Sequence, residues 1–157
     1  MKKSLVATVA CAVAVSLGMT SCKKEGIHIG VIQHVEHDAL NASYKGFVDA
    51  LKDAGYEDGK NIHIDYENAQ NDQSNNVTIA DKFANDNVDL ILAIATPSAA
   101  AAAARTEEIP ILVTAVTDPA DAKIVESNEK PGRNVSGTSD LTPVKQQMQL
   151  LHPYYLP

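Results

Sequence analysis

Short apolar runs alternate with longer stripes of helical period along the chain after residue 26. Five runs rich in β-branched and aliphatic residues predict strands, at 27–32, 61–66, 88–94, 110–116 and 134–138. Between and after them, apolar residues at helical spacing or alanine-rich sequence predict four helices, at 40–54, 77–84, 97–105 and 142–151. Strands that alternate with helices over short connections indicate βαβ units. We therefore predict a three-layer α/β/α domain with a mainly parallel sheet.

Local signals support several of these elements. Gly55 follows the first helical stripe where a C′ glycine is expected, and Pro97 fits the first turn of the alanine-rich segment. The run 88–94 is almost continuously apolar, as in a strand covered on both faces. Residues 99–104 are six consecutive alanines, which we interpret as part of a close-packed helix rather than a low-complexity linker.

The amino end has the pattern of an export signal. Lys2 and Lys3 precede an apolar stretch over 5–17, and small residues lead to Cys22. Small residues directly before a cysteine resemble a bacterial lipobox, which implies a signal peptide at 1–21, lipidation of Cys22 and a polar tether at 22–26. Met19 departs from the usual leucine, and ordinary cleavage nearby is the alternative. We expect an exported, membrane-anchored lipoprotein.

The charge balance limits the classes of partner. The chain has 13 basic and 20 acidic residues, so its formal net charge is −7. Loss of the leader with Lys2 and Lys3 makes the mature chain more acidic still. An acidic chain with 4% aromatic residues is poorly suited to nucleic acid, so we expect no such partner. Membrane contact is expected through the lipid alone.

Polar residues follow four of the five predicted strands. In open parallel sheets, ligands bind outside the carboxyl ends of the strands. The segments at this edge are 33–38, 95–99, 117–119 and 139–143, and each carries a hydroxyl or a carboxylate. A ligand site is therefore predicted where these loops converge.

Two of these segments have a definite chemical reading. Thr96 and Ser98 at a helix start offer hydroxyls and free N–H groups, which suit a carboxylate; alternatively, Thr96 only caps the helix. Asp118, between Thr117 and Pro119, could receive an ammonium group, although a helix cap is somewhat favoured because Asp before Pro is common at a helix start.

Catalytic and metal chemistry are poorly supported. The chain lacks a Gly-x-Ser-x-Gly elbow, a P-loop and a Gly-x-Gly-x-x-Gly loop. His34 and His37 enclose Glu36, but a His-x-x-His pair without further ligands is a weak metal signal. A solvated loop with one or two ligand contacts is the favoured interpretation. We expect no enzyme activity, no cofactor and no dedicated metal site.

Several of these segments together resemble the substrate-binding lipoproteins of ABC importers, in the branch that includes tryptophan- and tyrosine-type binding proteins. The segments are Gln-His-Val-Glu-His-Asp-Ala-Leu from residue 33, 61–66 with Asn-Ala-Gln from 68, Val-Asp-Leu-Ile from 88, Ala-Ile-Ala-Thr-Pro-Ser-Ala from 93, Ala-Val-Thr-Asp-Pro from 115 and Pro-Gly-Arg-Asn-Val-Ser-Gly-Thr-Ser-Asp from 131. The likeness covers about 27–151. It implies the amino-terminal lobe of a periplasmic-binding-protein type I-like fold, with flavodoxin-like strand order. It also implies a small ligand, and an amino acid, aromatic or other, is suspected.

The resemblance also implies the ligand contacts and the partners. Eight residues carry over as ligand-binding: Gln33, Glu36, Thr96, Ser98, Thr117, Asp118, Ser139 and Asp140. Thr96 and Ser98 would hold the carboxylate, and Asp118 or Glu36 the ammonium group. An ABC permease and an ATPase are the expected protein partners.

The end of the chain departs from the family pattern. Members are about twice as long, whereas residues 152–157 no longer resemble them and Pro153 is predicted to break the last helix. We expect a truncation or frameshift that leaves a lone lobe with an exposed sheet edge. Such a lobe is predicted to bind ligand weakly or undetectably.

Two other functions remain open. A lipid-anchored interaction or sensor module would need no second lobe. An enzyme of flavodoxin-like topology is disfavoured by the missing phosphate motifs. The sequence does not identify the ligand.

Overall fold

The computed structural model describes the backbone of residues 26–155 and the side chains of residues 26–150. The predicted signal peptide, the lipidation site at Cys22 and nearly all of the tether lie outside the described residues. Of the divergent end predicted at 152–157, only the backbone of 152–155 is described.

Five strands form one parallel sheet in the described part of the chain. They are β1 (Ile27–Gln33), β2 (Ile62–Asn68), β3 (Leu90–Ile94), β4 (Ile111–Val116) and β5 (Val135–Ser139). Their order is β2-β1-β3-β4-β5, and every pair is parallel. The predicted parallel sheet and its flavodoxin-like strand order are confirmed.

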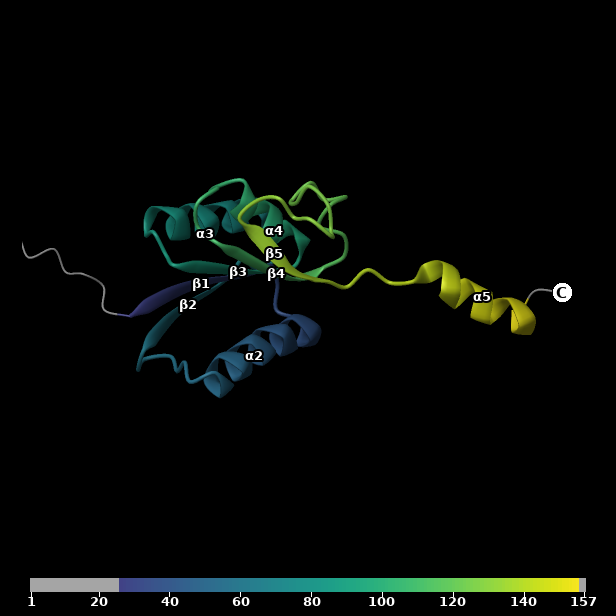
Figure 1. The fold of residues 1–157 in the computed structure, drawn as a ribbon, viewed down its shortest axis with the longest axis horizontal. Helices are drawn as coiled ribbons and strands as arrows, with labels where there is room; N and C mark the ends of the chain where they lie inside the picture. Colours follow the sequence, from purple (N-terminus) through teal and green to yellow (C-terminus); the bar gives the residue numbers. More distant parts are fainter. Residues whose placement is uncertain (1–25, 156–157) are drawn as a thin grey trace, which may run out of the picture.

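Helices cover both faces of this sheet (Figure 1). Helix α2 (Asp38–Asp53) lies on one face, and α3 (Gln73–Asn85) and α4 (Thr96–Ala103) lie on the other. The predicted three-layer arrangement is therefore confirmed. Ala99, Ala101 and Ala102 are buried, as expected for a close-packed alanine-rich helix.

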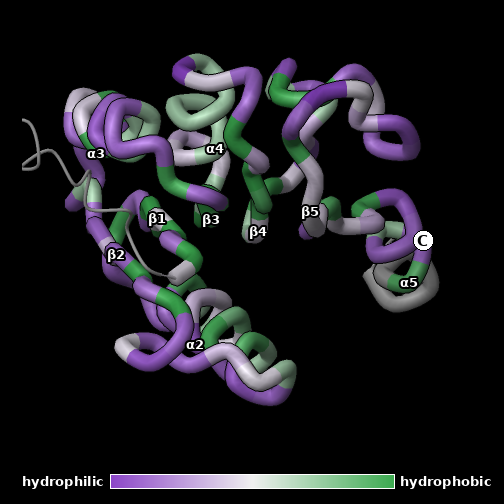
Figure 2. Tube along the Cα trace, turned by 60° about the vertical axis from the view of Figure 1, so that its left-hand side comes forward, coloured by the Kyte–Doolittle hydropathy of each residue, from purple (hydrophilic) through white to green (hydrophobic). Residues whose placement is uncertain are grey.

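The core has two parts, one on each face of the sheet. Along β3, Ile91 and Ala93 pack on the α3 and α4 side, while Leu92 and Ile94 pack on the α2 side. This alternation is what a strand period of two produces when both faces are covered. The central strands β3 and β4 are accordingly coloured as hydrophobic along most of their length in Figure 2.

Gly30 of β1 permits the close approach of α3. A Cβ atom at this position would lie 2.6 Å from the Phe83 ring, which is itself fully buried. The absence of a side chain at Gly30 is thus what lets the largest buried side chain of this core sit directly on the sheet.

Helix ends follow local signals in one case and contradict them in another. Helix α2 ends before Gly55, which has φ +88°, as the predicted C′ glycine requires. The predicted break at Pro153 is wrong, because helix α5 (Val144–Tyr155) runs through it. A proline ring holds φ near the helical value, so Pro153 is compatible with helical backbone even though it cannot donate the usual backbone hydrogen bond.

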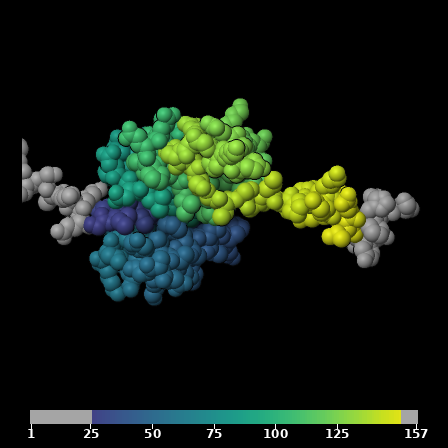
Figure 3. All heavy atoms as spheres, in the orientation of Figure 1, coloured from purple at the N-terminus to yellow at the C-terminus, as the bar shows by residue number. Residues whose placement is uncertain are grey.

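Helix α5 extends away from the body of the lobe (Figure 3). Its described side chains, over residues 144–150, are exposed, including the apolar Val144, Met148 and Leu150. Within residues 26–155, no helix combines the length and apolar character needed to cross a membrane.

Candidate functional site

The carboxyl ends of the central strands are in register at one edge of the sheet. Gln33, the last residue of β1, pairs with Asn68 of β2 on one side and Ile94 of β3 on the other. Ile94 pairs with Thr114 of β4. The loops that follow these strands therefore meet at this edge, as the sequence predicted.

Gln33 is fully buried and is only partly satisfied by its neighbours. Its Nε2 donates to the carbonyl oxygen of Val35 (3.0 Å) and to Oδ1 of Asn41 (2.7 Å). Asn41 in turn donates to Oε1 of Glu36 (3.4 Å), so Gln33 and Glu36 are joined through α2. The Gln33 Oε1 atom is buried without a hydrogen-bond partner among the described residues.

The histidines of this loop have different tasks. His37 is the N-cap of α2, and its Nδ1 accepts a hydrogen bond from the backbone N–H of Ala39 (3.2 Å). His34 is half-buried, and its Nδ1 lies 2.9 Å from Nδ2 of Asn76. Among the described residues, no three His, Cys, Asp or Glu side chains gather as a metal site would need.

Helix α4 begins one residue earlier than predicted. Thr96 is the first helical residue rather than the N-cap, and the residue before it is Ala95, with φ 81° and ψ 155°. The capping prediction for Thr96 is therefore wrong. Its half-buried hydroxyl makes no hydrogen bond to another described residue. Only glycine adopts the backbone conformation of Ala95 without strain.

A second strained alanine lies on the adjacent strand. Ala115 has φ 54° and falls where the pairing of β4 with β5 shifts between Val113 and Val116. Ala95 donates its backbone N–H to the carbonyl oxygen of Thr114 (3.0 Å), next to that irregularity. Two of the six non-glycine residues with positive φ in the described chain thus lie at the carboxyl ends of β3 and β4.

Ser98 is placed in the interior rather than at the surface of this edge. It is fully buried, and its hydroxyl donates to Oδ1 of Asn76 (2.8 Å) in the first turn of α3. The structure therefore connects Ser98 to His34 through Asn76. A direct contact between its hydroxyl and a ligand stays a prediction.

Asp118 organises the turn after β4. Its Oδ1 accepts from Nδ2 of Asn128 (2.9 Å) and from the backbone N–H groups of Asp121 and Ala120 (3.1 Å each). The hydrogen bonds, that of Asn128 first, lower the pKa of the Asp118 carboxyl, and desolvation only partly opposes them. Asp118 therefore holds a turn and caps no helix, because no helix of the described chain lies between β4 and β5. A contact of its carboxylate with a ligand ammonium group stays a prediction.

Thr117 is linked to the end of β5. The exposed Ser139 hydroxyl donates to the carbonyl oxygen of Thr117 (2.6 Å), and the Asp140 N–H donates to the Val116 carbonyl oxygen (3.1 Å). The Asp140 side chain is exposed. Among the eight predicted positions, hydrogen bonds thus join Gln33 to Glu36 through Asn41 and join the end of β4 to Ser139 and Asp140, while Thr96 and Ser98 share only the first turn of α4.

Sequence reasoning missed three asparagines that connect these positions: Asn41, Asn76 and Asn128. For Asn76 a signal existed, because it lies three, four and seven residues before Ile79, Ala80 and Phe83 on the buried face of α3. A polar residue in an apolar stripe needs an internal partner.

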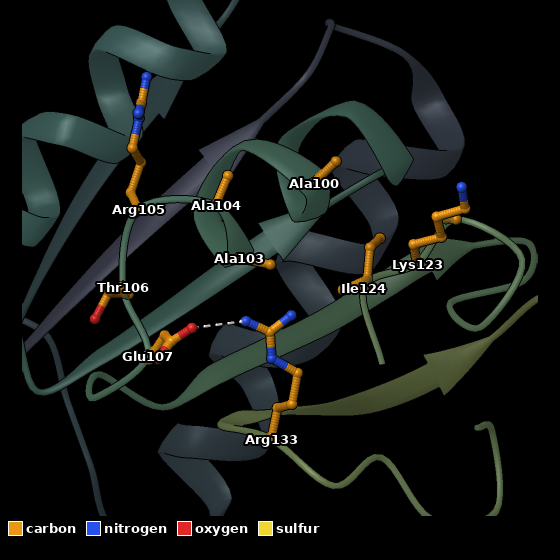
Figure 4. Close-up of a pocket in the computed structure, with 10 residues that line it drawn as sticks. Ala100, Ala103, Ala104, Arg105, Thr106, Glu107, Lys123, Ile124 and Arg133 are labelled. Carbon is orange, nitrogen blue, oxygen red and sulfur yellow. Dashed lines mark hydrogen bonds and ion pairs between the residues drawn. The ribbon is translucent and has the colours of Figure 1, made fainter. Parts of the chain in front are cut away.

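A separate pocket of about 350 Å³ lies at the other end of α4 (Figure 4). Ala103, Ala104 and Arg105 line one side, and Arg133 reaches across it to Glu107 (3.1 Å). None of the eight predicted residues lines this pocket. Its place at the carboxyl end of α4 separates it from Thr96 and Ser98.

Known proteins resemble this chain over most of its described length. A tyrosine-binding protein of Clostridioides difficile (strain R20291) is 53% identical over 132 residues, covering 84% of this chain and 38% of that protein. The ligand-free, open structure of a substrate binding protein with adhesive properties from Clostridium difficile matches with a TM-score of 0.78 and 54% identity. That match covers 82% of this chain and 43% of the solved one.

A third relative was solved with a ligand. It is a domain from Streptococcus pneumonia in complex with L-Trp, with a TM-score of 0.76 and 39% identity over 81% of this chain and 43% of the other. The chain therefore spans about two-fifths of the length of these relatives.

A family model described as "ABC transporter substrate binding protein" matches residues 28–157. This is a family of transport binding proteins and not an enzyme class. On the strength of that match and of the shared fold, the chain belongs to the ABC transporter substrate-binding protein family.

Proposed function

We propose that this chain is the solute-binding component of an ABC importer and binds an amino acid at the carboxyl edge of its sheet. The pair of strained alanines, Ala95 and Ala115, carries this proposal. Strained backbone of this kind costs about 1–3 kcal/mol per residue and tends to persist where function requires the geometry. Relatives named for tyrosine and solved with L-Trp support the ligand class.

The two charged groups of an amino acid have separate partners at this edge. Thr96 offers a hydroxyl and a backbone N–H at the positive end of the α4 dipole, which suits a carboxylate. Glu36 is exposed and has one long hydrogen bond, so it is the better partner for the ammonium group. Asp118 is less suited, because one of its oxygens already accepts three hydrogen bonds.

Gln33 contributes to the ammonium side in this proposal. Its Oε1 is a buried acceptor without a described partner, and such an atom costs about 1–3 kcal/mol while it stays unpaired. A small shift of the loop at 34–37 would open it to the ligand ammonium group. Thr117, Ser139 and Asp140 form the far wall of the same site.

The proposal extends to location and partners. The protein acts outside the cytoplasm, held to the membrane by a lipid on Cys22, and delivers its ligand to an ABC permease that an ATPase drives. Metabolic labelling with a palmitate analogue tests the anchor, with Cys22→Ala as the control. Labelling that persists in the variant would contradict it.

Ligand binding is tested by NMR on the 157-residue chain in detergent. Millimolar L-tyrosine, L-tryptophan and L-leucine are expected to shift backbone resonances at residues 33–36 and 95–98. Thr96→Val should weaken binding about three- to tenfold, since one hydrogen bond is lost. Thr78→Val is the matched control, because this exposed hydroxyl lies on α3 and bonds only the Ser74 carbonyl. Unchanged resonances at the carboxyl edge with all three amino acids would overturn the proposal.

A further inference from the structure

His34, Asn76 and Ser98 form a continuous polar chain across three elements. Asn76 Nδ2 lies 2.9 Å from His34 Nδ1 and donates to the carbonyl oxygen of Asp72 (3.0 Å). Ser98 Oγ donates to Asn76 Oδ1 (2.8 Å). Asn76 and Ser98 are both fully buried, so the chain ties the loop after β1 to the first turns of α3 and α4 from the inside.

The hydrogen bonds of Asn76 fix the proton position on His34. A carbonyl oxygen only accepts, so the amide group that faces Asp72 has to be the NH₂. The second hydrogen of that NH₂ points to His34 Nδ1, which therefore acts as an acceptor. An imidazole that accepts at Nδ1 is neutral and carries its proton on Nε2.

The backbone of His34 is also held on both sides. The His34 N–H donates to the Ile94 carbonyl oxygen (3.3 Å), and its own carbonyl oxygen accepts from the Asn71 N–H (2.8 Å). The two ring nitrogens point in different directions. With Nδ1 engaged by the buried Asn76, the Nε2–H of this half-buried side chain remains a donor without a described partner.

We propose that His34 donates its Nε2–H to a carboxylate oxygen of the ligand, and that Asn76 and Ser98 are positioning residues that hold the ring in this tautomer. The inference rests on the proposed function, because it assigns a third donor to the same site. It also accounts for a fully buried Asn–Ser pair, which an apolar pair could replace if packing alone mattered.

The first experiment reads the tautomer directly. Nitrogen-15 spectra of the histidine rings in the 157-residue chain, at mildly alkaline pH, should show His34 as the Nε2–H form. Asn76→Asp replaces the donor with an acceptor and should move the proton to Nδ1. Asn85→Asp is the matched control, because this exposed residue of α3 carries the same change of charge far from the His34 ring and should leave the His34 spectrum unaltered. An Nδ1–H form in the unmodified protein would overturn the proposal.

The second experiment measures ligand affinity. L-Tryptophan is titrated beside L-tryptophan amide, which lacks the carboxylate. His34→Ala should weaken L-tryptophan binding about tenfold or more, the effect of one hydrogen bond to a charged group, and leave the amide unaffected. His34→Gln retains a donor and should restore most of the affinity. Ser98→Ala should broaden the His34 ring signals and weaken L-tryptophan binding to a smaller extent.

The outcomes separate the two proposals. If L-tryptophan shifts residues 95–98 but binds His34→Ala as tightly as the unmodified protein, the role of His34 is refuted and the proposed function stands. If no amino acid shifts any resonance at the carboxyl edge, the proposed function fails and the role of His34 fails with it.

Discussion

The backbone N–H of Ala95 donates to the carbonyl oxygen of Thr114 across 3.0 Å. This bond joins the residue after β3, which has a strained backbone, to β4. Thr114 directly precedes Ala115, the strained alanine of β4. Neither residue has a side chain that could act on a ligand. Their importance lies in the backbone directions that they impose on Thr96 and Thr117.

Replacing Ala95 with glycine should stabilise the fold. Glycine adopts φ 81° and ψ 155° freely, so relief of strain outweighs the added entropy of the unfolded chain by roughly 0.5–1 kcal/mol. Urea unfolding measures the change. Ala100→Gly, at an exposed position inside α4, should instead destabilise by about 0.5–1 kcal/mol. Equal losses in both variants would show that Ala95 is not strained.

Replacing Gly30 with alanine should destabilise the fold by about 1–3 kcal/mol, because the new methyl group overlaps the Phe83 ring. The free energy of unfolding in urea tests this. Gly46 offers a control, since a Cβ there meets nothing within 4 Å and alanine should stabilise α2 by about 0.5–1 kcal/mol. The double variant Gly30→Ala with Phe83→Leu should recover part of the loss. A Gly30→Ala protein as stable as the original would refute the packing argument.

The lowered pKa of Asp118 makes this turn sensitive to acid. The folded protein holds this carboxyl's proton more weakly than the unfolded chain does, so the group contributes stability above its unfolded pKa of about 4. The contribution is lost as pH falls through the lower, folded pKa. Carbon-13 titration of the carboxyl should show this depression, and Asn128→Ala should reduce it. A titration at the ordinary aspartate value would contradict the hydrogen-bond geometry.

Lys82 should contribute modestly to the attachment of α3. Its Nζ lies 2.8 Å from Asp65 and 2.7 Å from Glu67, both on β2, and these hydrogen bonds raise the pKa of the lysine. That contribution is present below the unfolded lysine pKa of about 10.4 and disappears as pH rises through the folded pKa.

Lys82→Met should cost at most about 1 kcal/mol, because the group is partly exposed, and less at high salt. Unfolding at low and high NaCl concentration measures this difference. Lys45→Met, which removes a single ion pair with Asp49 on the exposed surface of α2, should cost less. A cost for Lys82→Met that does not change with salt would exclude the electrostatic explanation.

The sequence predicted the sheet well because periodicity and length determine strands that are covered on both faces. It also located the edge where the polar loops meet, since that follows from parallel strands alone. It failed where one residue of backbone strain moved a boundary, so that Thr96 became the first helical residue instead of the cap.

The internal partners were harder to predict. Ser98 and Gln33 were predicted as ligand contacts at the carboxyl edge, and the pattern around them did not indicate that both side chains would be fully buried. Their environment depends on Asn76 and Asn41, which lie on other elements, 22 residues from Ser98 and eight residues from Gln33 respectively. Pattern analysis along one segment does not report such contacts between segments. The proton position on His34 depends on them as well.

The strand order has a consequence for how the chain can fold. Strand β1 takes β2 on one side, and β3, β4 and β5 are then added on the other side in the order in which they occur along the chain. Each new strand is added at an edge of the growing sheet, and none has to be inserted between two strands that are already paired. A nascent chain that emerges amino end first can therefore build this sheet outward, one crossover at a time, without undoing earlier pairing.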